Sequence, residues 1–172
     1  TLVPELSWKM NEGEVWLVIG PNGGGKAAFL NALAGNADGV GSGERITPNT
    51  EGLYSNLFSD SSELVSLERA ARLIQEEREN DESDYLEDGV DHGRTGRIFI
   101  AQALAPQLKK GVPHSELPVT VRQLESDPAI KLCGIEKILD RGLKYMSTGE
   151  IRRTLLARAL VSGKKLLILS DP

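Results

Sequence analysis

The sequence is poor in the residues that form crosslinks and metal clusters. Its 172 residues include one cysteine, Cys133, and two histidines, His92 and His114. A single cysteine excludes an intramolecular disulfide and suits a reducing compartment, and we expect it to be a buried small residue. Neither histidine has a second ligand at metal-binding spacing, so the sequence offers no metal ligand set and both should face solvent.

Long apolar runs and an excess of basic charge are also missing. No stretch approaches the roughly 20 apolar residues of a membrane-spanning helix. The first ten residues lack the basic and apolar regions of a signal peptide. The formal net charge is −5 at pH 7, which disfavours a nucleic-acid backbone as a partner. We therefore expect a cytoplasmic protein that binds no nucleic acid.

Two short apolar runs predict buried strands of one parallel sheet, residues 14–19 and residues 165–169. Acidic residues gather between 81 and 91, where we expect a solvated loop rather than a metal site. The expected fold class is α/β, with a long and mostly helical insertion between the strands. The other expected elements are helices over 26–34, 62–80, 95–105, 120–126, 134–140 and 149–161, loops over 36–50 and 111–118, a C-cap at Gly35 and a short edge strand within 53–57.

A glycine-rich loop follows the first expected strand and has the pattern of a phosphate cradle. Glycines let successive N–H groups point at one phosphate, and the next helix adds its positive N-terminal end. A lysine at the end of such a loop reaches the β- and γ-phosphates. The order of strand, loop and helix favours this interpretation over a chance glycine-rich turn. The residues of the loop are Gly20, Pro21, Asn22, Gly23, Gly24, Gly25, Lys26 and Ala27.

The last residue of the loop departs from the pattern. Phosphate loops usually have Ser or Thr after the lysine because the hydroxyl binds Mg²⁺, whereas Ala27 carries a methyl group. Most of the cradle is backbone, so this change weakens the cation site more than the phosphate site.

A second stretch, residues 145–150 (Tyr-Met-Ser-Thr-Gly-Glu), opens the expected helix over 149–161. Ser147 and Gly149 place a hydroxyl and free amides at a helix N-terminus, where an anion binds favourably. An ordinary capped helix with Ser147 or Thr148 as N-cap explains the same residues. The local pattern leaves both interpretations open.

The order of these stretches resembles the ATP-binding-cassette (ABC) ATPases. The glycine loop is similar to their Walker A motif, residues 145–150 to their signature motif L-S-G-G-Q, and residues 166–172 to their Walker B segment. The resemblance covers the whole chain. It implies a P-loop NTPase fold with a RecA-like core, a parallel central sheet and a helical subdomain, about residues 62–145, inserted into a single domain, 1–172.

The resemblance also implies ligands and partners. ABC ATPases bind ATP with Mg²⁺ and work with membrane transporter subunits, which implies peripheral association with the inner membrane. Each of their sites combines the phosphate loop of one ABC domain with the signature of another, so a second ABC domain is expected, in the same full-length chain or as a dimer mate. Residues 88–95 and 144–150 resemble, more narrowly, the ModF family of tandem ABC proteins associated with molybdate transport. In that case the chain is a fragment containing the first of two cassettes.

The chain departs from the family at the positions that handle the metal and the water. Ser170 stands where Walker B has the aspartate of the Mg²⁺ shell. Asp171 stands where a glutamate polarises the attacking water and is one methylene shorter, so Lys26 and Asp171 are the candidate catalytic residues. Arg69 occupies the register of the family's glutamine loop, with Gln75 close but misaligned. The adenine-stacking aromatic and the switch histidine would fall outside residues 1–172.

Several function classes remain open at this point. The chain is an ATPase subunit that energises transport, or a degenerate module that binds nucleotide without hydrolysing it. A small-molecule kinase would need an acceptor site and does not explain the order of the motifs. A DNA-repair cassette would need a basic face, which the net charge of −5 disfavours.

The altered metal and water positions predict slow hydrolysis by this domain. We expect little phosphate release from ATP, with or without Mg²⁺, because a misplaced carboxylate loses much of its value as a base. Phosphate release assayed with and without Mg²⁺ measures this directly. Magnesium-dependent turnover on the order of 1 s⁻¹ or faster, ordinary for enzymes, would contradict it.

Overall fold

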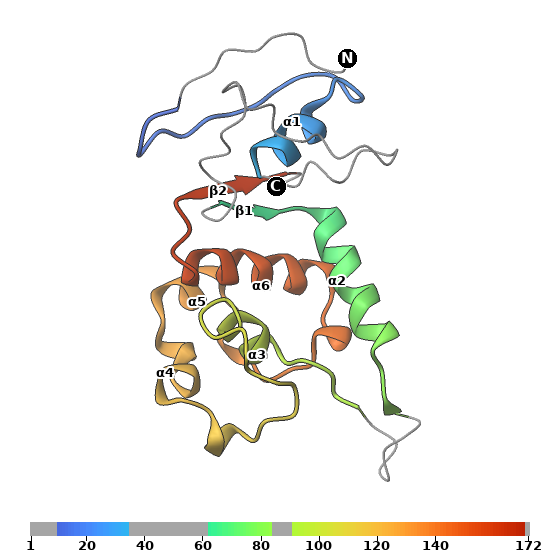
Figure 1. Cartoon of the computed structure of the whole chain (residues 1–172), viewed down its shortest axis with the longest axis vertical. Coiled ribbons are helices and arrows are strands. Elements are labelled where there is room, and N and C mark those ends of the chain that lie inside the picture. Colours follow the sequence, from blue (N-terminus) through green and yellow to red (C-terminus); the bar gives the residue numbers. More distant parts are fainter. Residues whose placement is uncertain (1–9, 35–61, 84–90, 171–172) are drawn as a thin grey trace, which may run out of the picture. The chain divides into compact units, whose positions relative to one another are not determined.

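The computed structural model describes residues 10–34, 62–83 and 91–170 (Figure 1). The chain divides into two compact units between Ser62 and Glu63. The first contains the glycine loop and helix α1 (Lys26–Leu33), and the second contains most of the remaining described elements. The predicted loop over 36–50, the strand within 53–57 and the C-cap Gly35 lie outside the described residues.

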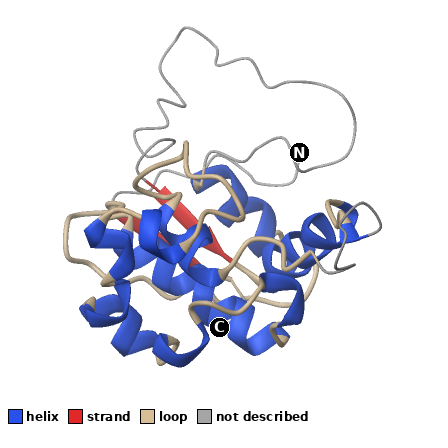
Figure 2. Ribbon diagram, turned by 90° about the horizontal axis from the view of Figure 1, so that it is seen from below, coloured by secondary structure: helices blue, strands red, loops and turns tan. Residues whose placement is uncertain are grey.

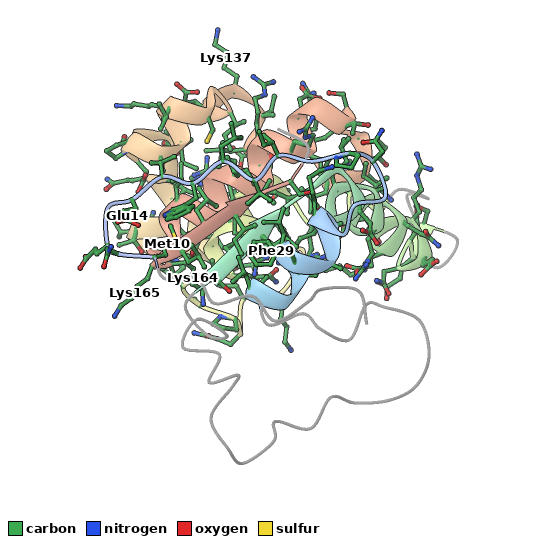
Figure 3. All side chains as sticks on the ribbon, turned by 90° about the horizontal axis from the view of Figure 1, so that it is seen from above. Met10, Glu14, Phe29, Lys137, Lys164 and Lys165 are labelled. Carbon is green, nitrogen blue, oxygen red and sulfur yellow. The ribbon has the colours of Figure 1, made fainter. Side chains whose placement is uncertain are left out.

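The segment before the glycine loop does not have the structure predicted for it, which was a buried strand. Residues 14–19 do not form a strand, and their apolar side chains are exposed, with Val15 at 97% and Leu17 at 83%. A buried strand needs hydrogen-bonded neighbours, and no other segment of the described chain pairs with this one. Local polar contacts to the carboxylate of Glu14 organise it instead, from Asn11 and from the indole N–H of Trp16 (2.9 Å). Figure 3 labels Glu14 on this segment.

Helix α1 confirms the helix predicted after the glycine loop. Its sequence, Lys-Ala-Ala-Phe-Leu-Asn-Ala-Leu, consists mainly of strong helix formers without proline or glycine. The amide of Phe29 donates to the carbonyl of Gly25 (2.9 Å), so the helical hydrogen bonds begin directly at the loop. The end of the loop is therefore fixed to the first turn of a helix.

The second unit combines two strands with a group of helices (Figures 1 and 2). The strands are hydrogen-bonded neighbours and run in the same direction. The elements are β1 (Ser62–Val65), α2 (Leu67–Glu79), α3 (Gly96–Ala101), α4 (Val119–Arg122), α5 (Pro128–Cys133), α6 (Thr148–Val161) and β2 (Leu166–Leu169), with 3₁₀ turns η3 (His114–Glu116), η4 (Leu124–Ser126), η5 (Glu136–Ile138) and η6 (Leu143–Tyr145).

The strand pair is only partly what the sequence predicted. The strand over 165–169 is confirmed as β2, but it pairs with β1 and not with residues 14–19. The first residues of the predicted helix over 62–80 form β1, and the helix begins only at Leu67 because Ser66 caps it. Burial alternates along β2, with Ile168 buried and Leu169 exposed, so the prediction of a fully buried strand was wrong.

Helix α6 lies at the centre of the apolar core of this unit. Its buried residues Ile151, Leu155 and Ala157 pack with residues of α2, α3 and α5. Cys133 is buried in the same cluster, as predicted. The predicted helices over 95–105 and 149–161 are confirmed as α3 and α6, although α3 is shorter.

The short helices predicted before α6 are confirmed only in part. The range 120–126 belongs to α4 and η4, and 134–140 contains only η5. Helix α5 lies between them and was missed, although its signals are present in the sequence. Asp127 caps it, Pro128 occupies its first turn and Gly134 ends it at φ +61°.

Residues 94–97 pair with residues 139–143 and so position the segment that leads into α6. The backbone bonds run from Gly96 N to Arg141 O (3.1 Å), from Arg97 N to Leu139 O (2.7 Å) and from Leu143 N to Arg94 O (2.8 Å). Gly142 is required at this contact, because a Cβ there would lie 2.1 Å from the carbonyl oxygen of His92.

A buried guanidinium reinforces this pairing. Arg97 is 4% exposed, and its side chain donates to both carboxylate oxygens of Asp140 (2.7 and 3.0 Å) and to Glu125 (2.8 Å). It also donates to the carbonyls of Val121 and Arg122 (2.9 Å each), which ties α3 to α4. The bond with Asp140 raises the pKa of Arg97 above its ordinary value, so the side chain is charged at neutral pH.

The change Arg97→Met should destabilise the second unit. It removes the guanidinium from the carbonyls of Val121 and Arg122 and from two carboxylates, which costs about 2–4 kcal/mol of unfolding free energy. Urea unfolding followed by circular dichroism measures the loss. The matched control is Arg72→Met, which removes an exposed pair with Glu68 and should cost less than about 0.5 kcal/mol. Equal losses in the two variants would contradict the structural role of Arg97.

Candidate functional site: glycine loop and capped helix

The backbone of the glycine loop is bent at two of its glycines. Gly23 and Gly25 have φ of +78° and +82°, a region that favours glycine. The amide of Gly24 donates to the carbonyl of Pro21 (3.1 Å), which closes a turn. A Cβ at Gly24 would lie 3.0 Å from that carbonyl oxygen, so a larger residue would open the turn. The loop is therefore curled and not extended.

The side chain of Lys26 is directed back toward the start of the loop. Its Nζ donates to the carbonyls of Gly20 (2.7 Å) and Pro21 (2.8 Å). The charge of the lysine is thus held beside the start of the loop. Asn22 and Gly23 are exposed, and so is Ala27, whose methyl group offers no ligand for a cation.

The N-terminus of α6 is the second part of the candidate site. Ser147 is the N-cap, and its Oγ accepts from the amide of Glu150 (3.3 Å). The carboxylate of Glu150 accepts in return from the amide (2.8 Å) and the hydroxyl (2.9 Å) of Ser147. This reciprocal arrangement is a capping box. The interpretation as a capped helix, which the sequence left open, is therefore correct for the local contacts.

Glu150 is anchored on its other side by Arg141. Arg141 Nη1 donates to Glu150 Oε1 at 2.7 Å, and the Glu150 side chain is 19% exposed. The bond from the Ser147 amide, followed by that from its hydroxyl, lowers the pKa of Glu150 below its ordinary value. Glu150 is therefore ionised at neutral pH.

The next two residues of α6 are open to solvent. Thr148 and Gly149 are exposed, and their amides donate no hydrogen bond to any part of the described chain. A Cβ built at Gly149 meets nothing within 4 Å. These amides carry the positive end of a 14-residue helix, which attracts anions.

The remaining predicted site residues lie apart from these two groups. Arg69 stands in the first turn of α2, where its side chain donates to the carbonyl of Leu64 (2.8 Å) and pairs with Glu63 (2.8 Å). Gln75 is exposed on α2 and donates to Glu79 (2.8 Å). Ser170 follows β2 and donates its amide to Val65 (2.9 Å). Asp171 lies outside the described residues.

Three acidic residues that follow α2 in the sequence form ion pairs with Lys110 and Lys144, and the sequence contains no indication of these pairs. Lys144 Nζ donates to Asp81 (2.8 Å), and Lys110 pairs with Asp91 (3.2 Å) and Glu82 (2.7 Å). Asp91 is 8% exposed, so the expectation of a solvated loop is wrong for this residue. The sequence separation between lysine and carboxylate, 63 residues for the first pair, gave no local signal.

Both histidines line a separate cavity of about 480 Å³ in the second unit, beside Thr95, Ile98 and Leu117. His92 and His114 are exposed, which confirms the prediction that they face solvent. Within the described ranges no three His, Cys, Asp or Glu side chains are placed to hold a metal ion.

Comparison with known proteins identifies the family of this chain. The family model "ABC transporter" matches residues 3–172. The chain belongs to the ABC transporter family, whose ATP-binding domains have the P-loop NTPase fold and bind ATP with Mg²⁺. The resemblance found in the sequence is thereby confirmed.

Individual relatives are transport ATP-binding proteins. The ABC transporter ATP-binding protein ModF of Escherichia coli (strain K12) is 34% identical over 170 residues, 99% of this chain and 29% of ModF. The zinc import ATP-binding protein ZnuC of Ehrlichia chaffeensis is 25% identical over 99% of this chain and 54% of its own length. The molybdate/tungstate import ATP-binding protein WtpC of Thermococcus kodakarensis is 26% identical over 98% of this chain and 42% of its own.

The chain thus spans between about a third and about half of these relatives. No solved structure matches it significantly. None of the helices described for residues 10–34, 62–83 and 91–170 has the length and apolar character needed to cross a membrane.

The contact between Asp81 and Lys144 predicts a pH dependence of stability. The hydrogen bond from Lys144, followed by those from Ser83, lowers the pKa of Asp81 from 3.8 to about 2. A lowered carboxylate pKa stabilises the fold above the unfolded pKa, and this contribution is lost as the pH falls from about 4 toward 2.

The change Asp81→Asn should therefore lower stability at pH 7, and its difference from the wild type should shrink as the pH falls below 4. Urea unfolding midpoints at pH 7, 5, 4 and 3 measure the difference. Glu116→Gln, at an exposed carboxylate of η3, is the control and should change little at any of these values. A constant difference for Asp81→Asn would contradict the role of its charge.

Proposed function

We propose that this chain is the nucleotide-binding part of a transport protein and that residues 20–26 hold the phosphates of ATP. The observation that carries the proposal is the curled loop itself. The loop contains two glycines at positive φ and a turn between Pro21 and Gly24. It leads directly into α1, whose first residue, Lys26, donates to the carbonyl of Gly20. Backbone amides and a helix end together form a phosphate site that depends little on side chains.

The fit to Mg²⁺ is poor, in contrast to the fit to phosphate. Ala27 has no oxygen to offer a cation, and Ser170 replaces the carboxylate that the resemblance leads one to expect. Magnesium prefers oxygen ligands in near-ideal octahedral geometry. In our proposal, ATP binds through the loop and Lys26, and Mg²⁺ adds little to its affinity.

The catalytic part of the proposal concerns Asp171. We propose that its carboxylate takes the place of the water-polarising glutamate and does so poorly, so that hydrolysis by this domain is slow. The alternative is a non-hydrolysing module whose bound nucleotide regulates the association of domains. The lost hydroxyl at Ala27 supports the alternative, because the same cation serves binding and hydrolysis in phosphate-loop enzymes.

A second ABC domain is the proposed partner, as a further part of a longer chain or as a dimer mate. Ser147 and Gly149 would contact the γ-phosphate bound to that domain, and the open amides of α6 support this role. In our proposal residues 62–145 form the helical subdomain of the cassette. That this chain covers 29% of ModF is in keeping with a relative that contains more than one such unit.

The proposed substrate is supported by the names of the relatives. The name of WtpC points to molybdate or tungstate, and that of ZnuC points to zinc. The narrower resemblance to the ModF family points to molybdate as well. We propose a molybdate-related transport system, a membrane transporter subunit as partner and a cytoplasmic location at the inner membrane. Nucleic acid is not a proposed partner.

Removal of the lysine tests the phosphate site. Lys26→Ala should weaken ATP binding at least about tenfold, because a charge-assisted contact to phosphate is worth about 1.5–3 kcal/mol. Fluorescence titration with a labelled ATP analogue, with and without Mg²⁺, measures the affinity. The control is Lys137→Ala, at an exposed lysine of η5 (Figure 3).

The cation site is tested in the same titration by Ala27→Ser, which restores the hydroxyl. The wild type should bind ATP almost equally with and without Mg²⁺, and the variant should bind better when Mg²⁺ is present. Unchanged affinity in Lys26→Ala would overturn the phosphate site, and strong Mg²⁺ dependence of the wild type would overturn the weak cation site.

A further inference from the structure

The glycine loop contains a dipeptide with a chemistry of its own, Asn22-Gly23. Asn22 is the one asparagine in the sequence that is followed by glycine. Asparagine is thermolabile, because the backbone nitrogen of the next residue can attack its side-chain amide and expel ammonia. A side chain on that next residue hinders the attack, and glycine has none. The sequence therefore makes Asn22 the asparagine of this chain that is most open to conversion.

The turn in the loop presents both reacting groups to solvent. Asn22 and Gly23 are its central residues, between the carbonyl of Pro21 and the amide of Gly24 that close it (3.1 Å), and both are exposed. In the part of the chain that the structure describes, the side chain of Asn22 makes no hydrogen bond and the amide of Gly23 donates none. A Cβ built at Gly23 meets nothing within 4 Å, so no neighbouring group crowds the attack.

The other asparagines that the structure describes are held by hydrogen bonds or lie within a helix. The side-chain amide of Asn11 donates to Glu14 (2.6 Å), and that of Asn80 donates to the carbonyl of Glu76 (2.8 Å). An acidic residue follows each of these two asparagines. Asn31 lies within α1. Asn11 and Asn80 are therefore internal references against which the reactivity of Asn22 can be compared.

We propose that Asn22 is a self-modification site and that its conversion to aspartate or isoaspartate weakens the binding of phosphate by the loop. The nitrogen of Gly23 forms a bond to Cγ of Asn22 while the bond from Cγ to the side-chain nitrogen breaks. The amide proton of Gly23 leaves with that nitrogen as ammonia. Water then opens the cyclic imide at either carbonyl, which gives aspartate or isoaspartate. Water is the only co-reactant.

The product carboxylate opposes the proposed phosphate site in two ways. It places a negative charge in the loop, where it repels a phosphate. It also follows Pro21 directly, whose carbonyl accepts from Lys26 at 2.8 Å, so it attracts the charge of the lysine. Isoaspartate in addition lengthens the main chain by a methylene, which opens the turn between Pro21 and Gly24. This effect on phosphate rests on the proposed function, whereas the conversion itself does not.

Ageing the full-length protein at 37 °C and pH 8 tests the conversion. Peptide mass spectrometry should show the exchange of NH₂ for OH at Asn22 several times faster than at Asn11 or Asn80 in the same sample, with release of ammonia. Saturating ATP should slow the exchange, because a phosphate bound in the loop occupies the amide of Gly23. Asn22→Gln, whose longer side chain closes a larger ring more slowly, should release less ammonia over the same period.

The effect on nucleotide binding is tested by Asn22→Asp, which carries the product charge from the start. Its affinity for a labelled ATP analogue should be about fivefold lower than that of the wild type, the effect of one unit charge about 4 Å from another in water. Gln123→Glu, at an exposed residue that ends α4, adds the same charge and should leave the affinity unchanged. The aged wild type should lose binding in proportion to its converted fraction.

The outcomes separate this inference from the proposed function. Exchange at Asn22 that is no faster than at Asn80 overturns the inference and leaves the phosphate loop in place. Wild-type affinity in Asn22→Asp and in the aged protein, with binding still lost in Lys26→Ala, also overturns it. Absence of ATP binding in the fresh wild type overturns the proposed function and the effect on phosphate, while the mass spectra still report on the conversion.

Discussion

The pairing of residues 94–97 with residues 139–143 is the contact on which the position of α6 depends. Three backbone hydrogen bonds, the close approach at Gly142 and the buried Arg97–Asp140 pair all lie along it. Arg141 extends from the same stretch toward Glu150, so the contact reaches the helix end directly. A change in this pairing would move the cap and its acidic partner together, because the backbone that holds Arg97 also holds Arg141.

The glycine loop and the start of α6 share one feature, a set of backbone N–H groups outside the regular hydrogen bonds of a helix. In the glycine loop the backbone is bent by residues that tolerate positive φ, and a lysine lies along the carbonyls. At α6 the first donors are satisfied by a carboxylate of the same helix while the next two stay open. The loop has glycines and a lysine, whereas Ala27 and Ser170 stand where the family resemblance leads one to expect a hydroxyl and a carboxylate.

The elements predicted well are those whose signals are local. The helix after the glycine loop, the helix from Thr148 and the strand ending at Leu169 follow from composition, capping and apolar pattern. The strand at Ser62–Val65 was hidden because its residues also fit a helical pattern until Ser66 interrupts it. In the candidate site, a cap at Ser147 or Thr148 could be predicted from local residues, whereas the pairs Arg141–Glu150 and Lys144–Asp81 depend on tertiary folding. The prediction that residues 14–19 are buried was wrong for the same reason, since apolar character alone does not supply a neighbouring strand.

The uncovered run Val15–Ile19 affects the colloidal behaviour of the chain. Five consecutive apolar residues without charge or proline, with Val15, Leu17 and Ile19 above 80% exposed, have the composition of segments that stack into intermolecular sheets. Preparations of these 172 residues alone would therefore tend to self-associate as concentration rises, by edge-to-edge strand addition. A lysine introduced at Leu17 would discourage such stacking, because repeated like charges repel along a growing fibre.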